Sequence, residues 1–349
     1  MEEKEFMNIA FQEAKKGKST WTNPQVGAVI VKDGKILAQG HHEKFGGPHA
    51  EVNTLNKLEY ISDAKGADMY VTLEPCSHFG KTPPCVQRVT EVGIKRVFIG
   101  MQDPNPIVSG NGIKYLKDHN IEVEVCNDTG DINEAYIFYY QNKRPLITVK
   151  YAMSVDGKIN KTGHHRTIIT GEEAYEDAQK LRSENQAILI GEHTVIIDNP
   201  QLTVRNREMD FPPIRVVVVR DVNTVEFGYK IFQNDGIKTL IFSQTKSRRR
   251  LPENVEVAVR DDWTPDKIVE ELAQRNIESL LVEGGSKLQA EFVHAGLVDK
   301  VVTYIAPKLF GGASLPAVQG DYRSSEIDFE ETEITKLGSD LKIELRRSK

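Results

Sequence analysis

The chain of 349 residues is longer than a single hydrophobic core usually grows, so its length predicts two domains. Hydrophobic residues make up 39% and charged residues 28%, a balance that can fill two packed cores and excludes a disordered chain. The formal net charge of −6 opposes a large nucleic-acid footprint, because proteins of that class neutralise many phosphates with clustered Lys and Arg. A small-molecule substrate is therefore favoured, and no nucleic-acid partner is expected.

The sequence also gives no sign of secretion or of a membrane span. No apolar run approaches the roughly 18 residues that cross a bilayer, and the first residues, MEEKEFMNIAFQEAKKGK, are acidic and amphipathic. The three cysteines are an odd number, which argues against a disulfide framework and for metal-binding or reactive roles. We therefore expect a cytoplasmic protein.

The first half of the chain alternates helical and strand-like segments. Apolar residues recur at helical spacing over residues 2–17, and a further helix is expected over about 48–58. Asp33-Gly34 between two β-rich runs predicts a tight hairpin, because these residues accept the positive φ angles that such a turn needs. The pattern is that of a layered α/β sheet, with strands expected at 26–32, 35–40, 67–73, 95–100 and 121–126.

A polar segment with a proline, QNKRPL at 141–146, separates this unit from a second one. We place the boundary there, with domains at 1–143 and 144–349. The second domain again alternates strands and helices. Its strands are expected at 147–153, 187–191, 214–219, 238–242, 279–283 and 301–306, and its helices at 171–183, 265–275 and 285–295.

Three residues of the first half form a candidate zinc site. His49 stands at the start of a predicted helix, Cys76 follows the strand MYVTLE, and Cys85 comes nine residues later. A catalytic zinc takes three protein ligands and keeps its fourth position for water, whose pKa it lowers to about 7. Glu51, two residues after His49, is then placed to move protons between this water and a leaving amine. The combination predicts a hydrolytic deaminase with one zinc ion per chain.

The spacing of the two cysteines departs from the common deaminase signature. Eight residues, SHFGKTPP, separate them instead of two, so a loop is inserted beside the metal. One alternative is a chance combination of an HAE tripeptide with two buried cysteines, and another is a structural zinc site with His78 as the fourth ligand. The strand-then-helix context favours the deaminase. Cys126, at a strand end, is interpreted as a packed thiol.

The HAE tripeptide at 49–51 and the run PCSHFGKTPPC at 75–85 resemble the deaminase half of the bifunctional riboflavin-biosynthesis deaminase-reductases, whose loop has this longer spacing. The segments NPQVG at 23–27 and DPNP at 103–106 match as well. The resemblance implies a cytidine-deaminase-like, three-layer α/β/α domain. It also implies that a pyrimidine and its ribosyl phosphate are contacted by Asn23, His42, Lys81, Asp103 and Asn105.

The residues themselves support these contacts unevenly. Lys81, on a loop that contains glycine, suits a phosphate, and Asn23 can offer an amide to the edge of a ring. Asp103 and Asn105 stand beside two prolines and could equally be turn residues.

The second half has no G-x-G-x-x-G fingerprint for a dinucleotide. Gly284-Gly285 opens a predicted helix and could cradle a phosphate, although many strand-to-helix turns contain two glycines. The segments KYAMSVDGKI at 150–159, TVIIDNPQLTVR at 194–205 and EGG at 283–285 resemble the reductase half of the same family. The resemblance implies a dihydrofolate-reductase-like α/β domain, in which no Rossmann motif is expected.

The resemblance also implies two sets of ligand contacts in this half. NADPH would be bound by Ala152, Thr194, Asp198, Ser243, Gly285 and Ser286. The substrate would be faced by Lys150, Arg182, Leu202, Arg205 and Glu283, with Lys150 near the sugar that is reduced. One position departs, because Ile168 or Ile169 stands where the family has a tryptophan. Lys246 and the three arginines at 248–250 could pair with the 2′-phosphate of NADPH or form a solvated basic loop.

The sequence therefore predicts two consecutive reactions of riboflavin synthesis. The first is zinc-dependent hydrolytic deamination of 2,5-diamino-6-ribosylamino-4(3H)-pyrimidinone 5′-phosphate. The second is NADPH-dependent reduction of the ribosyl group of 5-amino-6-(5-phosphoribosylamino)uracil to ribityl. The alternatives are a nucleoside or tRNA deaminase with an unrelated C-terminal module and a zinc-stabilised binding protein. A homo-oligomer without membrane partners is expected.

Overall fold

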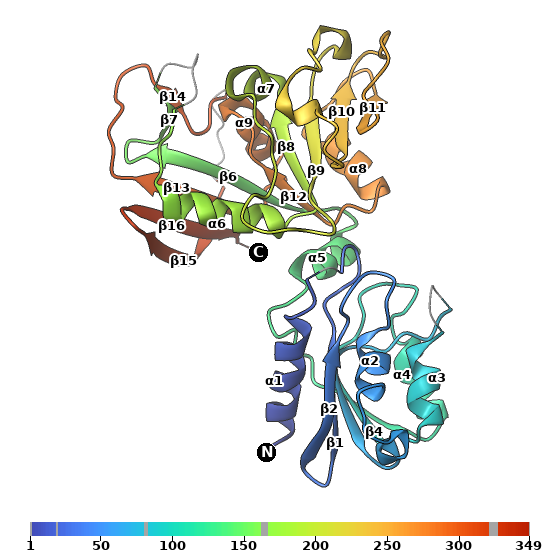
Figure 1. The fold of residues 1–349 in the computed structure, drawn as a ribbon. Helices are drawn as coiled ribbons and strands as arrows, with labels where there is room; N and C mark the ends of the chain where they lie inside the picture. The colour runs from blue at the N-terminus through green and yellow to red at the C-terminus, as the bar shows by residue number, and fades with distance from the viewer. Residues whose placement is uncertain (1, 19, 80–82, 162–166, 321–326, 349) are drawn as a thin grey trace. The chain divides into compact units, whose positions relative to one another are not determined.

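The computed structural model describes residues 2–18, 20–79, 83–161, 167–320 and 327–348. The chain divides into two compact units, Met1–Lys143 and Arg144–Lys349, and each is built on a large sheet of its own (Figure 1). Within the described ranges, no helix combines the length and the apolar character that crossing a bilayer requires.

The first unit is a five-stranded sheet in the order β2-β1-β3-β4-β5. The strand β1 runs antiparallel to both of its neighbours, whereas β3, β4 and β5 are parallel. The strands are β1 (Gly27–Lys32), β2 (Lys35–His41), β3 (Asp68–Leu73), β4 (Arg96–Met101) and β5 (Glu122–Val125). The helices are α1 (Glu3–Ala14), α2 (Ala50–Leu55), the 3-10 turn η1 (Ile61–Ala64), α3 (Cys85–Glu91), α4 (Asn111–Asp118) and α5 (Glu134–Asn142).

Helices cover both faces of this sheet, which explains why its central strands are apolar at successive positions. Along β1, Ala28 and Ile30 join the core beneath α2, α3 and α4, whereas Val29 and Val31 pack with residues of α1. The expected three-layer α/β/α architecture is therefore confirmed. The expected hairpin is confirmed as well, because Asp33 (φ 51°) and Gly34 (φ 74°) turn the chain between the paired ends of β1 and β2.

The second unit is a nine-stranded sheet in the order β11-β10-β9-β8-β12-β6-β13-β16-β15. All neighbours from β11 to β13 are parallel, and β16 and β15 are added antiparallel at one edge. The strands are β6 (Leu146–Ser154), β8 (Ala187–Gly191), β9 (Ile214–Val218), β10 (Thr239–Ser243), β11 (Val255–Val259), β12 (Ser279–Val282), β13 (Lys300–Ala306), β15 (Phe329–Leu337) and β16 (Asp340–Arg347). The short strands β7 (Lys158–Asn160) and β14 (Leu315–Pro316) pair separately.

Helices again pack on both faces of the large sheet. The core on one face contains residues of α8 (Pro265–Gln274) and α9 (Ser286–His294). The cores on the other face contain residues of α6 (Glu172–Ser183) and α7 (Glu192–Asp198), beside the turns η2 (Val222–Thr224) and η3 (Lys230–Phe232). Because β6, β8 and β12 are parallel, the loops that follow them lie at one edge of the sheet, where open α/β sheets bind ligands.

Several elements of the second unit were not expected from the sequence. These are α7, β11 and the hairpin of β15 and β16. The hairpin sequence FEETEITKLGSDLKIELRR is rich in charge, which suits β15 because this strand is paired on one side only. A charged edge strand lacks the apolar pattern by which the central strands were recognised.

Glu278, immediately before β12, is a buried carboxyl whose hydrogen-bond donor is a neutral amide. Its side chain is 6% exposed and accepts a 3.3 Å hydrogen bond from Gln186 Nε2. Burial raises the pKa of this carboxyl from 4.5 to about 8. The folded chain therefore holds a proton that the unfolded chain releases above pH 4.5, and stability falls as the pH rises from about 4.5 to about 8.

We expect Glu278→Gln to stabilise the protein, and more so at high pH, because an amide cannot ionise. The melting temperature of the variant should match that of the parent at pH 5 and exceed it by at least about 3 °C at pH 9, measured by thermal unfolding. The matched control is Glu291→Gln, which neutralises an exposed glutamate on α9. An equal shift at both pH values would contradict the assignment of the ionisation to Glu278.

Candidate functional sites of the two units

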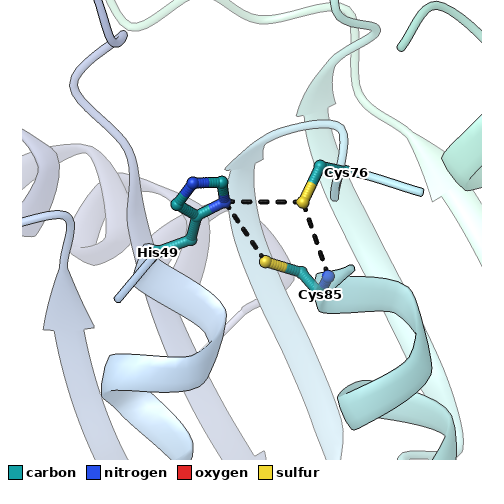
Figure 2. A group of neighbouring side chains, drawn as sticks. All are labelled: His49, Cys76 and Cys85. Carbon is teal, nitrogen blue, oxygen red and sulfur yellow. Dashed lines mark hydrogen bonds between the residues drawn. The ribbon is translucent and has the colours of Figure 1, made fainter. Parts of the chain in front are cut away.

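Three side chains from separate segments converge in the first unit (Figure 2). His49 immediately precedes α2, Cys76 follows β3, and Cys85 opens α3. His49 Nδ1 lies 3.4 Å from the Sγ atoms of both cysteines. The three ligand atoms all lie within 4.8 Å of one another, so the structure brings the predicted metal ligands together.

The geometry and the donor types fit zinc. A tetrahedral zinc with Zn–N near 2.0 Å and Zn–S near 2.3 Å separates its nitrogen and sulfur ligands by about 3.5 Å. One imidazole and two thiolates are also ligands that zinc prefers. His78 is exposed and does not belong to the group, so the alternative of a closed site with His78 as fourth ligand is not supported.

Hydrogen bonds and burial shift the pKa values of the groups around this site. Cys76 Sγ accepts bonds from the Cys85 side chain, His49 and the Cys85 backbone N–H, which lower the pKa of Cys76 to about 4 against the opposing effect of burial. The thiolate is the form that binds metal. Glu51, in the first turn of α2, is 3% exposed and lies beside Cys85, and burial raises the pKa of its carboxyl. A buried carboxyl beside a metal site is suited to accept a proton and release it again during a reaction.

Asn23 and His42 lie beside the metal ligands. His42 Nδ1 carries the hydrogen, because it lies 2.9 Å from the carbonyl oxygen of Pro48. His42 Nε2 therefore accepts a 3.1 Å bond from Asn23 Nδ2. The rings of His42 and His49 meet edge to face at 5.4 Å, and burial lowers the pKa of His42. His42 thus lies against the metal ligand His49, and Asn23 is joined to His42.

Asp103 and Asn105 lie in the loop after β4 and make the bonds of turn residues. Asp103 Oδ1 accepts bonds from the Asn105 backbone N–H at 2.8 Å and from the Tyr136 hydroxyl at 2.9 Å, and burial raises the pKa of Asp103 to about 6. Asn105 Oδ1 accepts from the Ile107 backbone N–H at 3.1 Å. The turn role that the sequence left open is therefore present, and a substrate contact would be additional to it.

Of three other residues in this unit, one cannot be compared with the expectation, one differs from it and one was not expected. Lys81 lies outside the described residues. Cys126 is exposed, so its interpretation as a packed thiol was wrong. Glu74 was not singled out at all, yet its buried carboxylate accepts four backbone N–H bonds. The only sequence signal was an acidic residue at the end of a strand, directly before Pro75-Cys76.

In the second unit, three of the implied substrate residues form a buried ion cluster. Arg182 Nε and Nη2 donate to the two oxygens of Glu283 at 2.7 and 2.6 Å. Lys150 Nζ lies 3.9 Å from Glu283 Oε2. Burial by itself raises the pKa of Glu283, but the charges of Arg182 and Lys150 outweigh it and lower that pKa to about 2. Glu283 is therefore ionised and holds both cations in place.

The segment that contains Leu202 and Arg205 is tied to this cluster. Arg182 Nη1 donates to the Thr203 carbonyl at 3.3 Å. Leu202 has a φ of 51° and its side chain is buried in the core, so it would meet a ligand through its backbone. Arg205 is exposed, and its Nη1 donates to the Tyr175 hydroxyl at 3.2 Å.

Three of the implied cofactor residues, Thr194, Gly285 and Ser286, lie at the starts of two helices. Gly191 and Gly285 immediately precede α7 and α9, which follow the neighbouring strands β8 and β12. A Cβ atom at Gly285 would lie 3.5 Å from Thr194 Oγ1, so these two residues are neighbours. Ala152 lies on β6, and Asp198 ends α7. Two helix N-termini at the carboxyl edge of a parallel sheet fit the pyrophosphate of a dinucleotide.

Two implied cofactor contacts have side chains that are already engaged. The fully buried Ser243 hydroxyl accepts from the backbone N–H groups of Val222 and Thr245 at 3.0 and 3.1 Å. The Ser286 hydroxyl donates to the Pro316 carbonyl at 2.6 Å. These hydroxyls hold neighbouring loops, so a cofactor would meet the backbone of either residue.

The basic loop after β10 carries four exposed cations, one of which is also bonded to the backbone of a neighbouring turn. Arg249 Nη2 donates to the Val222 and Val225 carbonyls at 3.0 and 2.6 Å, and its guanidinium packs on the Phe227 ring. Lys246, Arg248 and Arg250 are exposed. Of the four cations considered for the 2′-phosphate, Arg249 therefore has a folding role of its own.

Comparisons with known proteins match both halves of the chain. Residues 1–101 match the family described as the cytidine and deoxycytidylate deaminase zinc-binding region. Residues 145–343 match the RibD C-terminal domain. The alternative of a deaminase with an unrelated C-terminal module is therefore wrong.

Several full-length relatives are similar to the whole chain. The riboflavin biosynthesis protein RibD of Aquifex aeolicus (strain VF5) is 37% identical over 99% of this chain and 98% of that protein. The RibD protein of Escherichia coli (strain K12) is 35% identical over 99% of each chain. The solved structure of Acinetobacter baumannii RibD, form 1, has a TM-score of 0.92 at 32% identity, covering 99% of this chain and 98% of that one.

A second solved structure, from Thermotoga maritima, has a TM-score of 0.87 at 36% identity and covers 99% of this chain and 98% of its own. It is described as a diaminohydroxyphosphoribosylaminopyrimidine deaminase/5-amino-6-(5-phosphoribosylamino)uracil reductase. The zinc ligands of the first unit, the two family matches and these full-length likenesses agree. The chain belongs to the RibD family of bifunctional riboflavin-biosynthesis enzymes, with a zinc-binding deaminase domain followed by a reductase domain.

Proposed function

We propose that residues 1–143 deaminate 2,5-diamino-6-ribosylamino-4(3H)-pyrimidinone 5′-phosphate and that residues 144–349 reduce the ribosyl group of the product to ribityl with NADPH. The observation that carries the proposal is the trio of His49, Cys76 and Cys85 with buried Glu51 beside it. The description of the Thermotoga maritima relative supplies the substrates. The division into two units and the two family matches support the assignment of one reaction to each unit.

In the deaminase unit, each implied residue has a separate task. Bound zinc supplies a water of lowered pKa. The Glu51 carboxyl accepts a proton from water and delivers it to the leaving amine, and its burial keeps that proton from bulk solvent. The Asn23 amide presents a polar edge to the pyrimidine, and the neutral His42 ring holds that amide through their hydrogen bond. Lys81 and Asn105 are assigned to the ribosyl phosphate side of the substrate.

In the reductase unit, the ion cluster orients the sugar against the nicotinamide. NADPH supplies the hydride, and the protein chiefly fixes the donor and the acceptor. Glu283 holds the Lys150 ammonium, which also lies 5.8 Å from the centroid of the Tyr304 ring. Lys150 is thereby held at a defined place, where it can donate hydrogen bonds to the ring-opened sugar. Arg205 is exposed and is assigned to the uracil or the phosphate of the substrate.

Two wider expectations are part of the proposal. A cytoplasmic location is supported by the cysteines, because Cys76, Cys85 and Cys126 are all free of disulfides and thiols persist in reducing compartments. The homo-oligomer stays a prediction, for which the mass in solution is the measurement.

The proposal predicts coupled turnover by the full chain. When the diaminopyrimidine phosphate and NADPH are supplied together to the zinc-loaded protein, ammonia release and NADPH oxidation should reach equal amounts. Ammonia is measured chemically and NADPH by its nicotinamide absorbance. Ammonia release without NADPH oxidation would reject the proposed second reaction. The absence of both signals would reject both reactions.

Glu51→Gln is expected to lower the rate of ammonia release at least about 100-fold, because an amide cannot move the proton. Zinc content should stay at one ion per chain, and reduction of the deaminated intermediate should stay unchanged. Glu59→Gln, which neutralises an exposed glutamate nearby in sequence, is the control. Retention of full deaminase activity in Glu51→Gln would disprove the proton-transfer role.

Glu283→Gln is expected to impair reduction and stability together. The change leaves Arg182 buried without its counter-charge, which destabilises the second unit by about 3 kcal/mol, and it releases Lys150. The double variant Arg182→Met, Glu283→Gln should regain stability but not reduction. Unfolding in urea and NADPH oxidation measure the two effects, and ammonia release is the internal control. Recovery of reduction in the double variant would show that Glu283 acts only through folding.

A further inference from the structure

Glu74 lies between the metal-ligand segment and the loop that follows β4. It comes directly after β3 and two residues before Cys76, and it is 4% exposed. Its Oε2 accepts from the backbone N–H groups of Asp103 and Gly110 at 3.2 and 2.9 Å. Its Oε1 accepts from those of Gly112 and Ile113 at 2.8 and 3.1 Å. One carboxylate thus fastens both the loop and the helix after it.

The physical reason for these bonds is the start of α4. The first N–H groups of a helix have no partner within it, and a negative charge is favourable there. Glu74 supplies both the acceptors and the charge from another segment. The fit is close, because a Cβ atom at Gly112 would lie 2.0 Å from the Pro75 carbonyl oxygen. Only glycine at this position lets α4 pack directly against the residue before Cys76.

The loop so fastened carries two of the proposed substrate contacts. Glu74 holds the backbone of Asp103, and the Tyr136 hydroxyl holds its side chain. Asn105 is in turn bonded to Asp103 Oδ1 through its backbone and to the Tyr140 hydroxyl through its side chain, at 3.3 Å. The position of the loop relative to Cys76 therefore depends on Glu74 on one side and on α5 on the other.

We propose that Glu74 is a positioning residue of the deaminase, whose carboxylate sets the distance between the metal ligand Cys76 and the substrate loop at 103–110. The inference rests on the proposed function, because Asp103 and Asn105 are assigned to the substrate there. Glu74 itself is occupied by four backbone groups and acts through the loop. Its loss should therefore affect substrate binding more than the chemical step.

The test is Glu74→Gln in the zinc-loaded full chain. The amide NH2 group must face two backbone N–H donors whichever way the side chain turns, so two of the four bonds are lost. We expect KM for deamination to rise at least about tenfold, with a smaller change in kcat. Zinc content and the reductase rate of the same chain should be unchanged. By hydrogen exchange, the amides of Asp103, Gly110, Gly112 and Ile113 should lose protection.

The matched control is Glu122→Gln, which makes the same chemical change at an exposed glutamate on β5. A second variant, Gly112→Ala, keeps Glu74 but pushes α4 away from Pro75, and it should raise KM in the same way. An unchanged KM or undisturbed amide exchange in Glu74→Gln would overturn the inference. Loss of zinc from Glu74→Gln would overturn it too, because Glu74 would then position the metal ligand Cys76 and not the loop.

Asp103→Asn separates this inference from the proposed function. An unchanged KM in that variant would remove Asp103 from the substrate, whatever Glu74→Gln does. A raised KM in Asp103→Asn together with normal kinetics in Glu74→Gln would leave the substrate contact standing and reject the positioning role.

Discussion

The first backbone N–H groups of a helix have no partner within that helix, and in both candidate sites the structure must provide for them. In the first unit, the N–H of Cys85 at the start of α3 donates to Cys76 Sγ, and the start of α4 is capped by Glu74. In the second unit, α7 and α9 start side by side after neighbouring parallel strands, at Gly191 and Gly285. Parallel strands place such helix starts at one edge of the sheet, and this edge therefore suits the binding of anionic groups.

The parts that could be predicted from the sequence are those whose cause is local. The turn at Asp33-Gly34 follows from two residues, and the central strands follow from apolar runs that are covered on both faces. The metal ligands were also accessible, because His49, Cys76 and Cys85 are donor types with few other uses at such spacing. In each case the chemistry of a short segment already limits the structure.

The parts that could not be predicted depend on partners far away in the chain. Arg182 and Glu283 are separated by 101 residues, and nothing in either segment reveals that the guanidinium is committed to that carboxylate. Glu74 takes its partners from 29 to 39 residues away. The same holds for Ser243. The family resemblance implies that it contacts the cofactor, but its hydroxyl already accepts a hydrogen bond from the backbone N–H of Val222. A side chain's type gives its capacity for bonding, and only the fold gives its partner.

The two glutamates at the ends of β12 show how strongly the partner decides. Glu278 before the strand and Glu283 after it are both buried carboxyls of one short segment. Burial raises the pKa of Glu278 to about 8, whereas two neighbouring cations lower the pKa of Glu283 to about 2. A buried ion pair contributes little net stability, because desolvation offsets the attraction. The cluster at the carboxyl end of β12 therefore agrees better with the role proposed for it in the reductase site than with a role in stability.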